Sequence, residues 1–167
     1  MKTILQQISK LAIQLNKTTF TDEQIKSNWL GATAASNAAI LAAESRLGIE
    51  LPKDYKRFLS ITNGFFTPSD ATEPTFEMID KINYLKYVDA FLLEVWNKGI
   101  LANVGEQLNR AIVIGGLNDE QYFFLIPPKG ANSKWQYWKF ANWIPGEEPY
   151  LNLESYFVSV LEHMKNI

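Results

Sequence analysis

Few residues in this 167-residue sequence are of the types that carry out enzyme chemistry. The chain has no cysteine and a single histidine, His163, which disfavours a thiol nucleophile, a thiolate metal site and a Ser-His triad. His163 falls in the last turn of an expected C-terminal helix, where a cation near the negative end of the helix dipole is favourable. We therefore interpret it as a capping or surface residue, and we predict no metal ligand and no cofactor.

Two other patterns could support catalysis. Gly115-Gly116 follows an expected strand, but phosphate-binding loops need three spaced glycines before a helix, or a Gly-Lys-Ser/Thr sequence. A second strand follows within a few residues, which favours a hairpin turn. Glycosidase carboxylates can be far apart in sequence, so Asp119-Glu120 and Glu147-Glu148 leave a carboxylate-pair enzyme open. Solvated acids on loops are much commoner, and we predict that the chain is not an enzyme.

An aromatic segment from Trp135 to Phe140, followed by Trp143, could instead stack on a ligand. Alternation along a strand would place Trp135 and Tyr137 on one face and Trp138 and Phe140 on the other. We expect one set to enter the core, and the other could form an exposed patch of the kind found at binding hot spots. For the segment as a whole, we favour core packing over a binding patch.

The charge distribution points to a binding surface in the second part of the chain. The formal net charge is −2, with 16 basic and 18 acidic residues, so the basic excess of a dedicated nucleic-acid binder is missing. Residues 1–64 carry eight Lys/Arg and five Asp/Glu, whereas residues 65–167 carry eight and thirteen. A negative surface can steer a basic partner. The residues we predict to contact such a partner are Asp70, Glu73, Glu77, Asp119, Glu120, Glu147 and Glu148.

The order of elements predicts an α+β fold in a single domain, residues 1–167, with N-terminal helices packed on a mainly antiparallel sheet and a C-terminal helix. Periodicity and capping signals predict helices from residue 4 to 15, 21 onward, 36 to 47, 52 to 62, 89 to 98 and 151 to 164. Strands are predicted at 111–114, 122–126 and 135–140, with a loop at 67–75 and a short strand around Phe76. No signal peptide or membrane span is found, so we expect a cytoplasmic protein.

The helical half carries a specific set of motifs. Trp29-Leu30-Gly31 is followed by Glu44 to Gly48, then by Leu51-Pro52-Lys53-Asp54-Tyr55-Lys56-Arg57-Phe58-Leu59 and finally by Asn63-Gly64. In this order and spacing the motifs resemble the SUKH superfamily, specifically the branch of Smi/Knr-like relatives of yeast cell-wall assembly regulators. The similarity spans residues 29–160, and the stretch from Asp80 to Arg110 fits it poorly. The motif residues supply turns and buried side chains, so they predict a scaffold rather than a site.

The resemblance implies an α+β domain without catalysis. For bacterial members it implies an immunity protein that binds and occludes a cognate toxin, namely the C-terminal domain of a protein toxin, with a basic nuclease as one class. The alternative is a non-catalytic regulatory or scaffold module of the same fold. We expect no direct contact with nucleic acid or membrane, and the sequence leaves the oligomeric state and the identity of the toxin open.

Overall fold

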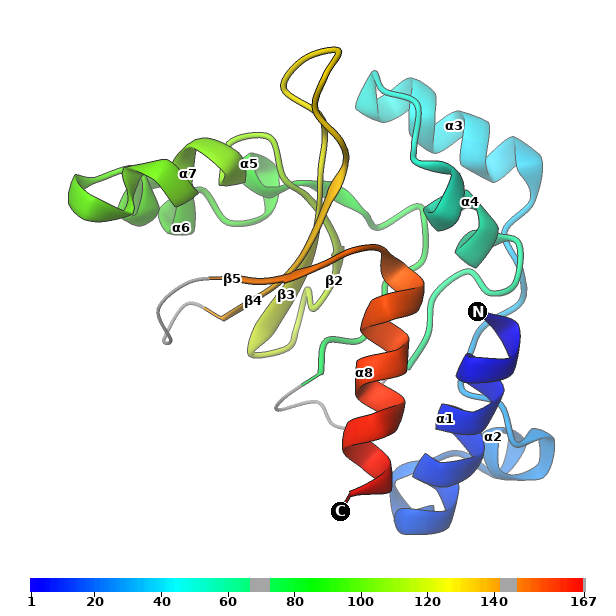
Figure 1. Cartoon of the computed structure of the whole chain (residues 1–167). Coiled ribbons are helices and arrows are strands. Elements are labelled where there is room, and N and C mark those ends of the chain that lie inside the picture. The colour runs from blue at the N-terminus through cyan, green and yellow to red at the C-terminus, as the bar shows by residue number, and fades with distance from the viewer. Residues whose placement is uncertain (67–72, 142–146, 167) are drawn as a thin grey trace.

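The computed structural model describes residues 1–66, 73–141 and 147–166 of the chain (Figure 1). Within these residues, eight α-helices and a five-stranded sheet form an α+β fold, which confirms the predicted class. The elements in chain order are α1 (Lys2–Leu15), η1 (Lys17–Thr19), α2 (Asp22–Ser27), α3 (Asn37–Leu47), α4 (Lys53–Leu59), β1 (Asn83–Tyr84), α5 (Leu85–Val88), α6 (Ala90–Trp96), η2 (Gly99–Leu101), α7 (Ala102–Leu108), β2 (Ile112–Gly115), β3 (Gln121–Ile126), β4 (Gln136–Ala141), β5 (Glu147–Tyr150) and α8 (Leu153–Lys165).

The sheet is an antiparallel meander in the order β1-β2-β3-β4-β5, so each strand pairs with its neighbour in the sequence. In the central pair, Gln121 lies opposite Ala141 and Ile126 lies opposite Gln136. The β2–β3 turn therefore lies at the same end of the sheet as the end of β4 and the beginning of β5. None of the helices described is both long and apolar enough to span a bilayer.

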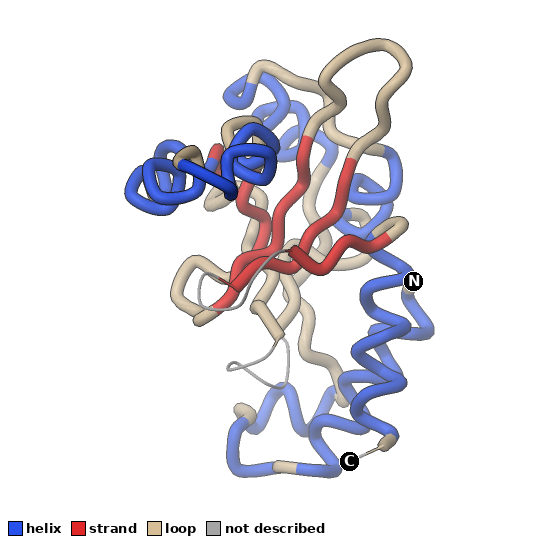
Figure 2. The backbone as a smooth tube through the Cα atoms, turned by 60° about the vertical axis from the view of Figure 1, so that its left-hand side comes forward, coloured by secondary structure: helices blue, strands red, loops and turns tan. Residues whose placement is uncertain are grey.

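Both faces of the sheet are covered, because side chains on successive strand residues point to opposite faces. Figures 1 and 2 show α1, α4 and α8 on one side and the helical arm, defined as residues 85–108 with α5, α6 and α7, on the other. The strand residues on the α8 side are Ile112, Ile114, Phe123, Leu125 and Tyr137. Those on the arm side are Val113, Phe124, Ile126, Trp138 and Phe140.

Local signals in the sequence correctly predict several helix ends. Thr21 caps α2 in a capping box with Gln24, and the side chain of Asn152 accepts a hydrogen bond from the Ser155 amide at the start of α8. Gly48 ends α3 with a φ of 68°, the left-handed conformation that glycine adopts without a steric penalty. These signals depend only on neighbouring residues, which is why the sequence reveals them.

The structure corrects three other expectations. Helix α4 ends at Leu59 instead of continuing to Thr62, whose hydroxyl donates to the Ala32 carbonyl at 3.0 Å. Phe76 forms isolated bridges to Phe65 and Gly115 in place of a strand. Glu147 and Glu148, expected on a loop, begin the edge strand β5.

The aromatic strand β4 packs in the core, which is the interpretation favoured for this segment from the sequence. Tyr137 is buried on the α8 side of the sheet, and Trp138 and Phe140 are buried on the arm side. Both sets of side chains therefore enter a core, because α8 and the arm each cover one face. Trp143 lies outside the described residues.

Candidate functional site

Six predicted contact residues come together at one end of the sheet. Glu73 and Glu77 lie on the segment that follows residue 72, Asp119 and Glu120 lie in the β2–β3 turn, and Glu147 and Glu148 begin β5. We call these six residues the acidic edge. The seventh, Asp70, lies outside the described residues. Three segments that are far apart in the sequence thus bring carboxylates to the same end of the meander (Figure 1).

Lys139 of β4 links two members of the acidic edge. Its ammonium nitrogen lies 3.4 Å from Glu73 and 3.1 Å from Glu148, and its side chain is 11% exposed. The Tyr156 hydroxyl donates to Glu73 at 2.8 Å, and the Tyr150 hydroxyl donates to Glu148 at 3.0 Å. Burial opposes the charged ammonium, but the Glu73 and Glu148 carboxylates outweigh it and raise the pKa of Lys139. Glu73 is thereby held in place as part of the fold.

Glu77 and Asp119 join the segment after residue 72 to the hairpin. A Glu77 carboxylate oxygen accepts the Leu117 amide at 3.2 Å, and Asp119 accepts the Thr75 amide at 2.6 Å. The Gly116 amide donates to the Thr75 carbonyl at 2.9 Å. Burial raises the pKa of Glu77, with a smaller contribution from the negative charge of Asp119, although the Leu117 amide opposes this shift. These two acids therefore position the β2–β3 turn, whatever else they contact.

Among the described residues at this end of the sheet, Glu120 and Glu147 are the two acids available to bind a partner. Glu120 is exposed, Glu147 is partly exposed, and neither is in an ion pair with any residue of the described ranges. Across the acidic edge, Lys139 is the one cation that forms an ion pair within the part of the chain described. The arrangement is therefore suited to bind a basic surface, because Glu120 and Glu147 have no ion-pair partner among the described residues and Glu148, although paired with Lys139, is half-exposed.

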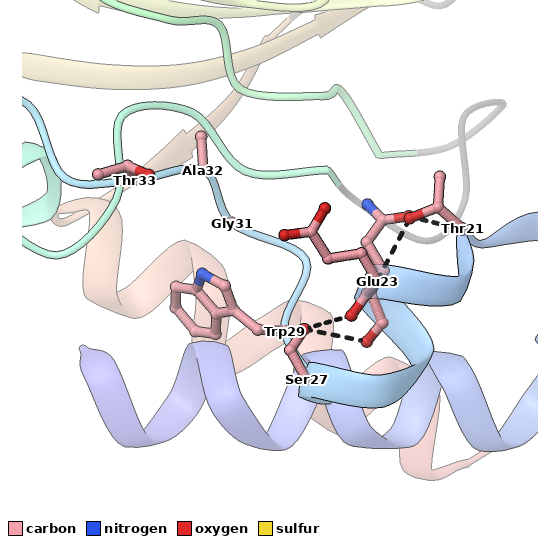
Figure 3. Close-up of a pocket in the computed structure, with 8 residues that line it drawn as sticks. Thr21, Glu23, Ser27, Trp29, Gly31, Ala32 and Thr33 are labelled. Carbon is pink, nitrogen blue, oxygen red and sulfur yellow. Dashed lines mark hydrogen bonds between the residues drawn. The ribbon is translucent and has the colours of Figure 1, made fainter.

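A separate pocket of 590 Å³ lies beside α2 (Figure 3). Three of its polar side chains are used by the protein itself: Thr21 and Gln24 form the capping box, and the Ser27 hydroxyl donates to the Glu23 carbonyl at 2.7 Å. Among the described residues that line the pocket, Glu23 is the single carboxylate, whereas glycoside hydrolysis requires a pair. The residues that line it are Thr21, Glu23, Gln24, Ser27, Trp29, Gly31, Ala32 and Thr33.

Gly31 explains part of the Trp-x-Gly motif. A β-carbon at this position would lie 2.4 Å from the Thr62 hydroxyl oxygen and 2.6 Å from the Trp29 ring. The indole therefore packs against a backbone that only glycine allows, and its ring also meets Phe65 edge-on at 5.7 Å. The motif is accounted for by packing.

The remaining motif residues also hold the scaffold together. Glu44 accepts the Leu51 amide at 2.8 Å, and the Asn63 side chain accepts the Ile79 amide at 2.8 Å. Asp54 accepts a hydrogen bond from the Tyr137 hydroxyl and another from the Leu153 amide, which connects α4, β4 and α8. No group of three or more potential ligands among the described residues could hold a metal ion. His163 lies exposed near the end of α8.

Sequence reasoning missed the role of Lys139, although a single lysine in the middle of an aromatic strand was a usable signal. It also missed the large apolar side chains that the arm exposes, which include Phe91. Periodicity marks such residues as helical without showing which side of the helix is covered.

Comparison with known proteins gives one family. The model of the SMI1 / KNR4 family (SUKH-1) matches residues 34–162. The matched range runs from just before α3 into the last turns of α8, so it contains the whole sheet, the arm and the acidic edge. A search of curated proteins finds no match.

Proposed function

Because the chain belongs to the SMI1 / KNR4 family (SUKH-1), we propose that it is a non-catalytic immunity protein, which binds a basic toxin domain in the cytoplasm and occludes its active surface. A nuclease is the toxin class that best fits this chemistry, since its substrate-binding surface is positively charged. The acidic edge is the surface that we assign to the contact. The supporting observation is the convergence of six carboxylates from three chain segments, matched by a single ion-paired cation among the described residues.

Physical chemistry favours association through such a surface. Exposed charges of one sign accelerate diffusional encounter with an opposite surface, with rate constants of about 10⁸ M⁻¹s⁻¹ or more at low salt against about 10⁵–10⁶ without steering. Residues that are already fixed by hydrogen bonds, such as Glu73 and Asp119, lose little conformational entropy on binding. The acidic edge is thus pre-organised in part.

The first test is protection of cells. The chain is co-expressed with the C-terminal domain of a candidate toxin, chosen by the presence of a large toxin gene next to the gene for this chain, and growth is compared with cells that express the toxin alone. We expect growth to be restored. Equal growth arrest in both cultures would rule out immunity to that toxin, and a regulatory or scaffold module would then be the better assignment.

The second test locates the contact. Glu120→Lys combined with Glu147→Lys reverses two carboxylates that have no ion-pair partner among the described residues, so the fold is preserved. We expect at least a hundredfold weaker toxin binding and a smaller dependence of the association rate on salt. The matched control combines Glu23→Lys with Glu162→Lys, two exposed acids on α2 and α8 outside the acidic edge. If both pairs of substitutions weaken toxin binding equally, the acidic edge is not part of the interface.

A further inference from the structure

A ladder of single β-bridges extends the sheet beyond β2. Gly115, at the end of β2, pairs with Phe76 in the antiparallel sense. Phe76 in turn pairs with Phe65, and Phe65 pairs with Gly31. The Phe65 amide donates to the Phe76 carbonyl at 3.0 Å, and the Phe76 amide donates back at 2.9 Å. Among the described residues, Gly31 is the last member of this ladder and forms its edge.

The backbone of Gly31 is open on the side away from its bridge partner. The Ala32 amide donates to the Gly64 carbonyl at 3.1 Å. The Phe66 amide donates to the Leu30 carbonyl, also at 3.1 Å. Because these two bonds flank the bridge, the N–H and C=O of Gly31 point outward, as in any non-hydrogen-bonded antiparallel pair. Neither group has a hydrogen-bond partner among the described residues.

This edge lacks the features that prevent an exposed strand from pairing. Residues 29–35 contain no proline and no charged residue, and Ala32 and Thr33 are exposed. Edge strands that do not pair usually carry a proline or a charge, or are covered by another element. The edge at Gly31 can therefore accept one more strand.

Two pockets lie along this edge. The first is the 590 Å³ pocket beside α2 (Figure 3), and the second, of 330 Å³, is lined in part by α1. Both volumes fall within the roughly 300–1,000 Å³ of ligand sites. When a strand is added to a sheet edge, its backbone pairs with the edge and pockets of this kind take its alternate side chains. The residues that line both pockets are Ser27, Trp29, Ala32 and Thr33.

The first pocket favours a positive charge. Figure 3 shows the Glu23 carboxylate between α2 and the stretch that carries Gly31 and Ala32. This carboxylate has no hydrogen bond or ion pair with any described residue. The described residues that line the pocket include the indole of Trp29 but no Lys or Arg. A carboxylate and an aromatic ring are the groups that hold a basic side chain in proteins.

These observations define the occupant by its chemistry. We propose that the edge at Gly31 binds an extended peptide segment of another protein, which adds a strand to the ladder and places a Lys or Arg side chain against Glu23. The peptide residue opposite Gly31 donates its N–H to the Gly31 carbonyl and accepts the Gly31 N–H. The site contains no residue of the acidic edge, so this contact is additional to the proposed toxin contact.

A synthetic peptide library tests the proposal. Blocked, fluorescently labelled heptapeptides are prepared in pools that each fix one position and mix the others, and binding to the chain is measured by fluorescence polarisation. At one position we expect the Lys and Arg pools to bind at least about tenfold more tightly than the Glu pool. If no pool binds at about 1 mM peptide, or if no position favours a basic residue, the proposal is wrong.

N-methylation of the best peptide tests the backbone pairing. A methylated amide cannot donate, so we expect methylation of the amide opposite Gly31 to weaken binding at least about tenfold. Methylation of the next amide along the peptide should have little effect, because its N–H points away from the edge. Equal effects at every amide would contradict strand addition.

Glu23→Gln tests the recognition of charge. Glu23 is exposed and its carboxylate bonds to no described residue, so the fold is preserved. We expect the variant to lose the preference for basic over neutral peptides, and the matched control Glu162→Gln, an exposed acid of α8, to keep it. An unchanged preference in Glu23→Gln would overturn the assignment of the pocket.

Amide resonances of isotope-labelled protein locate the contact. Those of Gly31 and Thr33 should shift when the best peptide is added, whereas that of Glu120 in the acidic edge should not. If the Gly31 resonance instead shifts with protein concentration in the absence of peptide, a second copy of the chain occupies the edge and the proposal is wrong.

Discussion

Tyr55 carries a buried hydroxyl that is left without a hydrogen bond in the described part of the protein. It is fully buried, and its hydroxyl has no hydrogen-bond partner among the described residues. Burial, with a smaller effect of Glu77, raises the pKa of this hydroxyl. Tyr55→Phe removes a polar group that was desolvated without compensation, so we expect the free energy of unfolding to rise by about 1 kcal/mol. Urea denaturation measures the change.

Tyr156 is the matched control for this prediction. It is also fully buried, but its hydroxyl donates to the Glu73 carboxylate at 2.8 Å. Tyr156→Phe removes a hydrogen bond to a charged group, and we expect a loss of about 2 kcal/mol. If Tyr55→Phe destabilises the protein as much as Tyr156→Phe, the Tyr55 hydroxyl has a partner, such as a buried water.

Glu77 makes stability depend on pH. Because burial raises its pKa above the ordinary 4.5, the folded state binds this proton more tightly than the unfolded chain does. Stability from this group is therefore greatest below the ordinary pKa and decreases as the pH rises through the raised value. Glu77→Gln keeps an oxygen that can accept the Leu117 amide but removes the charge. We expect the variant to be more stable than wild type near about pH 7 and equally stable below about pH 4.

Denaturation curves at the two pH values check this expectation. The control is Glu120→Gln, a change of an exposed carboxylate in the same turn, which should show no such difference. A Glu77→Gln variant that is less stable than wild type at neutral pH would contradict the expected direction of the change.

At the scale of elements, Gly105 determines how α7 packs against α6. A β-carbon at this position would lie 2.2 Å from the Trp96 carbonyl oxygen, a backbone atom that cannot rotate away. Gly105→Ala should therefore separate the two helices and lower the free energy of unfolding by about 2 kcal/mol. Gly130→Ala is the control, since a β-carbon there has no atom within 4 Å. Thermal unfolding of both variants is the measurement. An unchanged unfolding temperature in Gly105→Ala would show that α6 and α7 accommodate the added methyl group.

Sequence patterns predict elements whose causes are local and miss those whose causes are distant. Thr21, Gly48 and Asn152 mark helix ends through bonds to residues a few positions away. Strand β5 has no such signal, because it contains two acids and Pro149 and forms by pairing with β4. The convergence that forms the acidic edge likewise depends on the register of the meander, which spacing alone does not reveal.

At the scale of the whole molecule, the acidic edge and the helical arm occupy different parts of the fold. The segments that carry the acidic edge lie at the hairpin end of the sheet, and the arm helices α5, α6 and α7 cover one face of the sheet (Figure 1). No residue belongs to both. The acidic edge is rich in negative charge and therefore selects a basic partner through electrostatic attraction, to which the exposed apolar Phe91 of the arm does not contribute.

This separation predicts that a substitution on the arm leaves toxin binding unchanged. Because distant sites without shared contacts act additively, Phe91→Asp should leave the toxin dissociation constant within about twofold of wild type. Conversely, Glu120→Lys with Glu147→Lys should lose toxin binding. Titration calorimetry measures the affinity of both variants. An affinity loss of more than about tenfold in Phe91→Asp would mean that the arm contributes to the toxin site or is coupled to it.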